Sequence, residues 1–289
     1  MIPLLDAALK GSAIVLIAFV VLRLWRSRPA AARHLVLASA LVCAAAVPLV
    51  GMAVPSWRVE TPAPMSAVNV TYEAVLPGTA GTAQASSTVR FPMATVLAAM
   101  WIGGVAVGLL IVLTGLARLA WIARNTTPVE SGAWAAIAIQ LAGEFGLARP
   151  PRLLQSDHPA LLVTWGFIDP KVLLPEGAAA WTESRVRVAL AHELAHVRRR
   201  DWIVQIGADL LRSVYWFNPL LWIGCARLRQ ESEQACDDAV LRLGVGGTAY
   251  AGHLLDLARA FRAHRRVWLP APAIARPSSL ERRVRAMLN

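Results

Sequence analysis

Long apolar stretches fill the first part of the chain, and segments of mixed polarity follow from about residue 125. The apolar stretches lie near residues 12–24, 35–54 and 94–116. About 20 helical residues cross the roughly 30 Å of hydrocarbon in a bilayer, so the second and third stretches predict membrane helices. The first stretch is shorter, but apolar residues before it extend it to a similar length. We therefore expect three membrane helices within residues 1–124.

The distribution of arginine predicts how these helices are oriented. The short loop between the first two helices carries four arginines, and Arg118 and Arg124 follow the third helix. The loop at 55–91 carries only two. Because positive loops stay on the cytoplasmic side, we expect a multi-pass protein of the inner (cytoplasmic) membrane. The N-terminus and the 55–91 loop would lie outside, and residues 125–289 would form a cytoplasmic domain.

Composition supports a membrane protein. Of the 289 residues, 56% are hydrophobic and only 16% are charged, against about 25% in soluble domains. Loop arginines account for much of the net charge of +11. Positive charge follows the first apolar run, which predicts a retained helix instead of a cleaved signal peptide. The three cysteines form no metal-type pair, and we expect ordinary buried thiols.

The second half of the chain alternates between helical and strand-like patterns. A short strand is expected at 152–155, and Gly166 and Asp169-Pro170 interrupt a β-rich stretch at 161–174, which predicts a hairpin or bent edge strand. Helical spacing or stop signals predict further helices near residues 134–145, 183–199, 220–243, 250–263 and 280–288.

The segment at 202–222 combines aromatic and apolar residues with Gln205, Asp209 and Arg212. Charges in the middle of a bilayer are costly, and the tryptophans and tyrosine suit a membrane surface. We expect this segment to be membrane-associated, at the interface or against the other helices, without a full span.

The strongest chemical signal is the HExxH sequence formed by His192, Glu193 and His196. In a helix, positions i and i+4 share one face, so both imidazoles can bind one zinc ion. Glu193 projects beside them and can act as general base on the attacking water. A surface helix with these three residues is the alternative, but the predicted helix, the preceding β-rich segment and downstream acidic residues favour a catalytic zinc site.

A third zinc ligand is expected from the acidic residues at 231–238. Glu233 and Asp237 lie four positions apart and share a helix face, so Glu233 can bind zinc while Asp237 accepts the free N–H of a ligand histidine. Glu231 is the main rival, about 200° round the helix from Glu233. Residues that could stabilise the oxyanion are His158, Arg229, Tyr250 and His253.

Several segments resemble the BlaR/MecR family of membrane metallopeptidases, which act as antirepressors in β-lactam signalling. The resemblance covers roughly residues 152–289, and its matching segments are Leu173-Leu174-Pro175, His192 to His196, Arg198 to Trp202, Tyr215 to Trp222, Glu233 with Ala235 to Leu241, and Ser278 to Arg283. It implies a mainly α fold, with three transmembrane helices and a gluzincin-type zinc peptidase domain of helices and a small β-sheet. It also matches Glu233 to the family's glutamate ligand.

This sequence departs from the β-lactam-sensing members of that family. We find no apolar segment after Gly244 that could cross a membrane and no Ser-x-x-Lys motif, so we expect the peptidase without the C-terminal penicillin-binding sensor. The resemblance implies a protein substrate, either a cytoplasmic repressor or the peptidase itself, in transmembrane signalling.

Two other functions compete with an active peptidase. One is a catalytically inactive signalling scaffold with a structural zinc site, which would have no need of a general base at Glu193. The other is a membrane-tethered nucleic-acid binder that uses the arginines at 259–285. That segment lacks interleaved stacking aromatics, so we expect it to meet anionic membrane lipid and expect no direct nucleic-acid contact.

Overall fold

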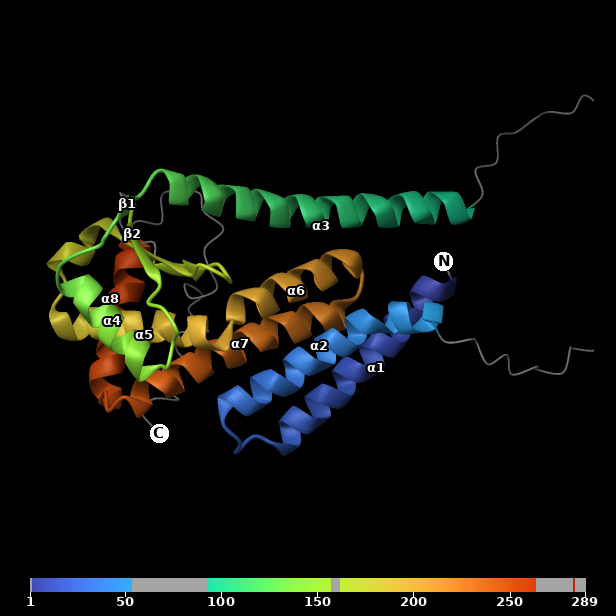
Figure 1. Cartoon of the computed structure of the whole chain (residues 1–289). Coiled ribbons are helices and arrows are strands. Elements are labelled where there is room, and N and C mark those ends of the chain that lie inside the picture. Colours follow the sequence, from blue (N-terminus) through green and yellow to red (C-terminus); the bar gives the residue numbers. More distant parts are fainter. Residues whose placement is uncertain (1, 54–92, 157–161, 264–282, 284–289) are drawn as a thin grey trace, which may run out of the picture.

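The computed structural model describes residues 2–53, 93–156, 162–263 and 283. Within these residues, three helices are long and apolar enough to cross a membrane, as the hydrophobic pattern predicted. They are α1 (Ile2–Leu24), α2 (Ala30–Ala53) and α3 (Met93–Arg124). Figure 1 shows them extending to one side of the β-sheet. The predicted 55–91 loop lies outside the described residues, and so does the helix predicted near 280–288 apart from Arg283.

Helix α3 is longer than the apolar pattern predicted. We expected it to end near residue 116, but its 32 residues continue to Arg124 and span about 48 Å at 1.5 Å per residue. The last turns of α3 extend beyond the roughly 30 Å of hydrocarbon and contact apolar residues there. Leu119 and Ile122 pack against a buried cluster that includes Leu154 and Trp165 of the sheet. Helix α3 therefore joins the membrane region to the sheet directly.

The predicted membrane-associated segment at 202–222 comprises helix α6 (Asp201–Val214) and the start of α7 (Pro219–Arg242), which form a hairpin. The Asn218 side chain accepts a hydrogen bond from the Leu220 backbone N–H at 3.1 Å and caps α7. In Figure 1 the hairpin lies between α3 and the α1–α2 pair, and it contacts all three helices. The hairpin packs against the other helices, which is one of the two arrangements that we expected.

Helix α3 is approached closely at two glycines, at one by α6 and at the other by the turn that follows α6. A Cβ atom on Gly104 would lie 2.2 Å from the Trp216 ring, and one on Gly108 would lie 2.7 Å from Ser213. The Trp101 indole also donates to the Val214 carbonyl at 3.0 Å. Small residues four apart allow such close backbone approach between membrane helices. This contact fixes the far end of α6 to α3.

The remaining elements form a small mixed sheet covered by helices. The strand order is β1-β2-β4-β3, with β2 parallel to β4 and the other pairs antiparallel. Strands β3 and β4 form the predicted hairpin, and the two-residue strand β1 was not predicted. The bounds are β1 (Thr127–Pro128), α4 (Ala133–Glu144), β2 (Arg152–Gln155), β3 (Val163–Trp165), β4 (Lys171–Leu174), a 3₁₀ turn η1 (Glu176–Ala180), α5 (Glu183–Arg199) and α8 (Gly247–Ala263).

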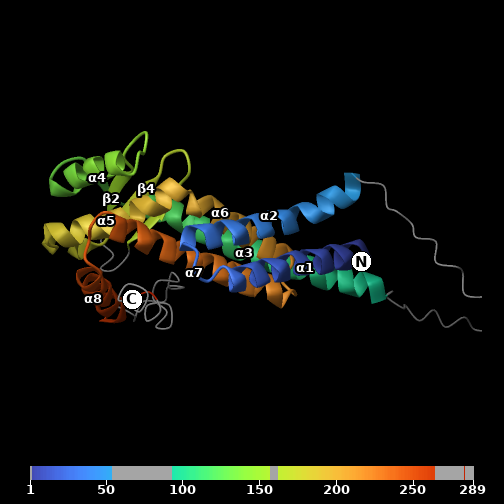
Figure 2. The same cartoon turned by 90° about the horizontal axis from the view of Figure 1, so that it is seen from below.

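Most buried apolar residues of the described structure belong to one of two large hydrophobic cores. One joins α4, the sheet, α5, the second half of α7 and α8, and its buried residues include Leu141, Val172 and Leu190. The other joins α1, α2, α6 and the first half of α7. Figure 2 shows α7 running from the membrane helices to the group that contains α5 and α8. Helix α7 therefore contributes to both cores.

Matched glycine substitutions should test the α3–α6 contact. A Cβ on Gly103 meets nothing within 4 Å, whereas one on Gly104 overlaps Trp216. Both Gly→Leu changes alter helix propensity equally, so packing alone separates them. We expect Gly104→Leu to unfold more easily than Gly103→Leu by about 1–3 kcal/mol, the usual cost of overpacking. Thermal unfolding in detergent measures this, and equal stabilities would contradict the described packing.

Candidate active site

Helix α5 carries the HExxH residues, and it begins at a side-chain cap and ends at a left-handed residue. Thr182 caps its start by accepting from the Arg185 backbone N–H. Arg200 ends it in the left-handed conformation, with a φ of 56°. That reversal starts α6 at once, so Asp201 returns toward His196 near the end of α5.

His192 is oriented by a carboxylate and a phenol behind it. Its Nδ1 lies 3.2 Å from Asp237 Oδ1 and 3.0 Å from the Tyr250 hydroxyl. Tyr250 in turn donates to Asp237 at 2.6 Å. When Nδ1–H donates to the carboxylate, Nε2 keeps its lone pair for a ligand. The structure thus brings Asp237 beside a histidine of the HExxH motif.

His196 has an equivalent carboxylate, which the sequence reasoning did not identify. Its Nδ1 lies 2.9 Å from Asp201 Oδ2, which also accepts from Ser232 at 2.6 Å and Arg199 at 3.1 Å. The two imidazole rings lie 4.9 Å apart between centroids. Asp201 sits directly after the run of arginines in the segment that carried the family resemblance, which is the one signal that pointed to it.

Glu233 of α7 faces both histidines from the opposite side. Its Oε2 is 3.7 Å from His192 Nε2, and its Oε1 is 3.7 Å from His196 Nε2. One ligand atom from each residue lies within 4.8 Å of the other two. Ligands of a tetrahedral zinc, at 2.0–2.1 Å from the metal, are about 3.3 Å apart. The three side chains fit a single zinc ion after small adjustments.

Two buried atoms and two pKa shifts support a cation at this point. Among the described residues, His192 Nε2 and Glu233 Oε2 are buried without a hydrogen-bond partner, although Glu233 Oε2 forms an ion pair with Arg283 at 3.2 Å. Burial would lower the pKa of His192, but hydrogen bonds to Asp237 and Glu233 outweigh it and raise the pKa to about 9. Burial would raise the pKa of Glu233, but His192 and the Arg283 charge lower it to about 2. The lowered pKa keeps the Glu233 carboxylate negatively charged, which is the form that binds a metal.

A second group of metal-binding residue types adjoins the first. His196, Asp201 and Cys236 also bring ligand atoms within 4.8 Å of one another. Burial, with nearby Asp201, raises the pKa of the Cys236 thiol well above its usual value, which disfavours the thiolate that zinc binds. The Nδ1 atom of His196 is also already engaged by Asp201. We therefore interpret Asp201 and Cys236 as residues that orient His196.

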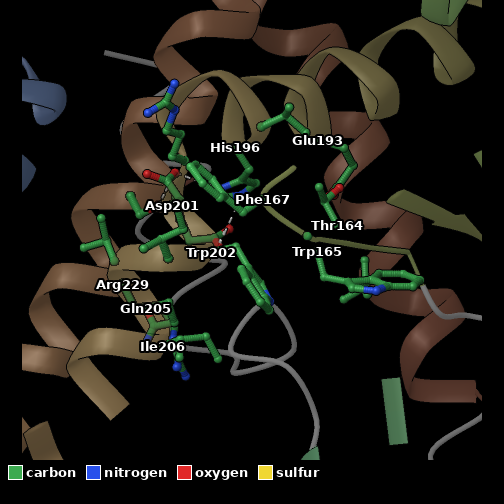
Figure 3. A pocket seen from close by; sticks show the side chains of 18 of the residues that line it. Thr164, Trp165, Phe167, Glu193, His196, Asp201, Trp202, Gln205, Ile206 and Arg229 are labelled. Atoms are coloured by element: carbon green, nitrogen blue, oxygen red, sulfur yellow. Dashed lines mark hydrogen bonds and ion pairs between the residues drawn. The ribbon is translucent and has the colours of Figure 1, made fainter. Parts of the chain in front are cut away.

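Glu193 faces a cavity of about 370 Å³ beside His196 and Glu233. The Thr164 hydroxyl, on edge strand β3, donates to Glu193 Oε2 at 2.5 Å. Figure 3 shows Glu193 and Thr164 together on one side of His196. The other walls come largely from apolar side chains of β3, its following turn, α3 and α6, including Leu119, Trp165, Phe167, Trp202 and Ile206.

The rival ligand Glu231 and the candidates for oxyanion stabilisation take different positions in the structure. Glu231 is 1% exposed and pairs with Arg33 at 2.9 Å and Arg227 at 2.6 Å, so its carboxylate is engaged away from the histidines. Arg229 lines the cavity, whereas the Tyr250 hydroxyl supports His192 from behind. His158 lies outside the described residues.

Together, the three apolar helices and the His-His-Glu cluster define a membrane protein with a metallopeptidase-like site. A family model described as BlaR1 peptidase M56 matches residues 2–287, and the chain belongs to this family. The resemblance seen in the sequence is thereby confirmed.

Two regulatory proteins are similar to this chain over part of its length. The regulatory protein BlaR1 of Bacillus licheniformis is 32% identical over 144 residues, which are 50% of this chain and 24% of that protein. The methicillin resistance mecR1 protein of Staphylococcus aureus is 26% identical over 88 residues, 30% of this chain and 14% of that protein. The matched segments thus span about a quarter or less of these relatives.

The two glutamates on α7 offer a matched test of the ligand assignment. Glu233→Ala removes the carboxylate that faces both histidines, whereas Glu231→Ala removes one that faces arginines. We expect Glu233→Ala to lose most of its bound zinc and Glu231→Ala to retain it. Metal analysis of the purified proteins measures this. The assignment is wrong if zinc is lost only from Glu231→Ala.

Proposed function

We propose that the chain is an integral-membrane zinc endopeptidase that hydrolyses peptide bonds of a cytoplasmic protein. One observation carries the proposal: three ligand atoms, from His192, His196 and Glu233, surround one point beside a cavity into which Glu193 faces. Zinc at that point, when bound, would polarise a peptide carbonyl and acidify water. Three protein ligands leave one coordination position open, which is the arrangement of catalytic sites.

Glu193 is proposed as the general base. It accepts a proton from the attacking water and then delivers that proton to the leaving amine. The Thr164 hydroxyl holds one carboxylate oxygen, so the other remains to take up the proton. This places the proton-transfer group at the cavity wall, next to the ligand His196.

The substrate peptide is proposed to add to the edge of the sheet. Strand β3 pairs only with β4 within the described sheet, because the order is β1-β2-β4-β3. An extended peptide along its other side would gain backbone hydrogen bonds. It would lie next to Glu193, because Thr164 of β3 contacts that residue. The apolar cavity walls favour a bulky apolar side chain near the cleaved bond.

The chain's relatives guide the choice of substrate. From the resemblance to the BlaR/MecR family, we propose a cytoplasmic transcriptional repressor or the peptidase itself as substrate, in transmembrane signalling. The alternative of an inactive scaffold with a structural zinc is less well supported. A structural site normally has four protein ligands and is closed, whereas this cluster has three and adjoins a cavity.

Replacing the base should separate catalysis from metal binding. Glu193→Gln keeps the shape and the Thr164 contact but cannot accept a proton. We expect cleavage of a repressor-type substrate to fall by at least about 10²-fold, with zinc content unchanged. Glu183→Gln, an exposed change in the first turn of the same helix, should cleave normally. Persistent proteolysis by Glu193→Gln would exclude this mechanism.

We propose that residues 1–124 form the transmembrane region and that residues 125–289 form a cytoplasmic domain, with the N-terminus outside. The arginine-rich loop between α1 and α2 and the charged end of α3 support this orientation. A cysteine placed at exposed Glu130 should resist a membrane-impermeant thiol reagent in intact cells and react after permeabilisation. Labelling in intact cells, above that of the parent chain, would reverse the orientation.

A further inference from the structure

A buried arginine from near the C-terminal end of the sequence lies behind the candidate metal ligands. Arg283 is 6% exposed, and its Nε and Nη2 donate to Asp237 at 2.8 and 2.7 Å. Its Nη1 lies 3.2 Å from Glu233 Oε2. The proposed reaction gives this residue no role, although it contacts one ligand and the carboxylate that supports another.

We propose that Arg283 is a positioning residue for the metal centre, an inference that rests on the proposed zinc site. It holds both oxygens of Asp237 in a two-pronged grip, a geometry that arginine provides and lysine does not. Asp237 then accepts from His192 Nδ1, which turns Nε2 toward the metal. Through Asp237 and Glu233, one side chain orients two of the three ligands.

Charge balance gives Arg283 a second effect on the same site. Three carboxylates, those of Glu193, Glu233 and Asp237, lie around the proposed metal, and each is buried or nearly so. A divalent metal compensates only two negative charges. Arg283 supplies the remaining positive charge at hydrogen-bonding distance, whereas Asp201 has its own partner in Arg199. Without Arg283, one buried carboxylate would lack a compensating charge, and an uncompensated buried charge is costly.

A positioning role and a simple packing role for Arg283 predict different effects on zinc affinity. A residue that only fills space or holds the C-terminal segment would change the stability of the fold but leave the zinc affinity of the folded protein unchanged. A positioning residue must change zinc affinity in protein that is still folded. Its effect must also depend on Asp237, because the grip acts through that carboxylate.

The test is zinc affinity of the full chain in detergent, measured by competition with a chelator. Arg283→Ala should bind zinc about 10–100-fold more weakly, the usual effect of losing an outer partner of a metal ligand. Arg283→Lys keeps the charge but not the grip and should fall between wild type and Arg283→Ala. Arg242→Ala removes an equal charge from an exposed position on α7 and should match wild type.

A double substitution keeps the inference testable if Arg283→Ala folds poorly. In an Asp237→Asn background, Arg283→Gln should weaken zinc binding much less than it does alone, because the shared interaction is already lost. Circular dichroism verifies that each variant is folded. Wild-type affinity in folded Arg283→Ala, or additive effects in the double variant, would overturn the role of Arg283 while leaving the zinc peptidase intact. Absence of zinc binding by the wild type would overturn both.

Discussion

Two imidazoles on one helical turn can hold a metal only if their ring orientations are fixed, and this constraint organises the site. Helix α5 provides the spacing of His192 and His196, but spacing alone leaves each ring free to turn. The Nδ1 atoms are therefore engaged from behind, by Asp237 of α7 and Asp201 of α6. Both remaining nitrogens then face Glu233. Helices α6 and α7, which neighbour α5, therefore each supply a carboxylate that fixes the orientation of one imidazole ring.

The same helices connect the site to the membrane region. Helix α6 begins at Asp201, which contacts His196, and reaches the close glycine contacts of α3 at its other end. Helix α7 starts among α1 and α2 and carries Glu233 and Asp237 further along. Arg33 of α2 pairs with the buried Glu231. The candidate metal ligands and the apolar helices are thus parts of one packed unit.

Much of this arrangement could be predicted from local pattern. Apolar length identified α1 to α3, and Thr182 with helical spacing gave the bounds of α5. The i, i+4 rule paired His192 with His196 and Glu233 with Asp237. It could not choose between Glu233 and Glu231, because that choice depends on which side of α7 meets α5 and which meets the arginines Arg33 and Arg227.

Contacts between distant segments explain what the pattern missed. The support of His196 by Asp201 depends on the left-handed turn at Arg200, and nothing local marks an arginine for that conformation. Arg283 meets Asp237 across 46 positions. The extension of α3 to Arg124 depends on apolar partners in the sheet. Each of these follows from tertiary packing, which hydrophobic periodicity does not report.

X-ray absorption at the zinc edge of the metal-loaded protein tests the central claim most directly. We predict only nitrogen and oxygen neighbours at about 2.0–2.1 Å, with the outer-shell scattering of two imidazole rings. Sulfur at about 2.3 Å would instead place the metal at Cys236, in the adjoining group. That result, or the signature of a single imidazole, would contradict a centre built from His192, His196 and Glu233.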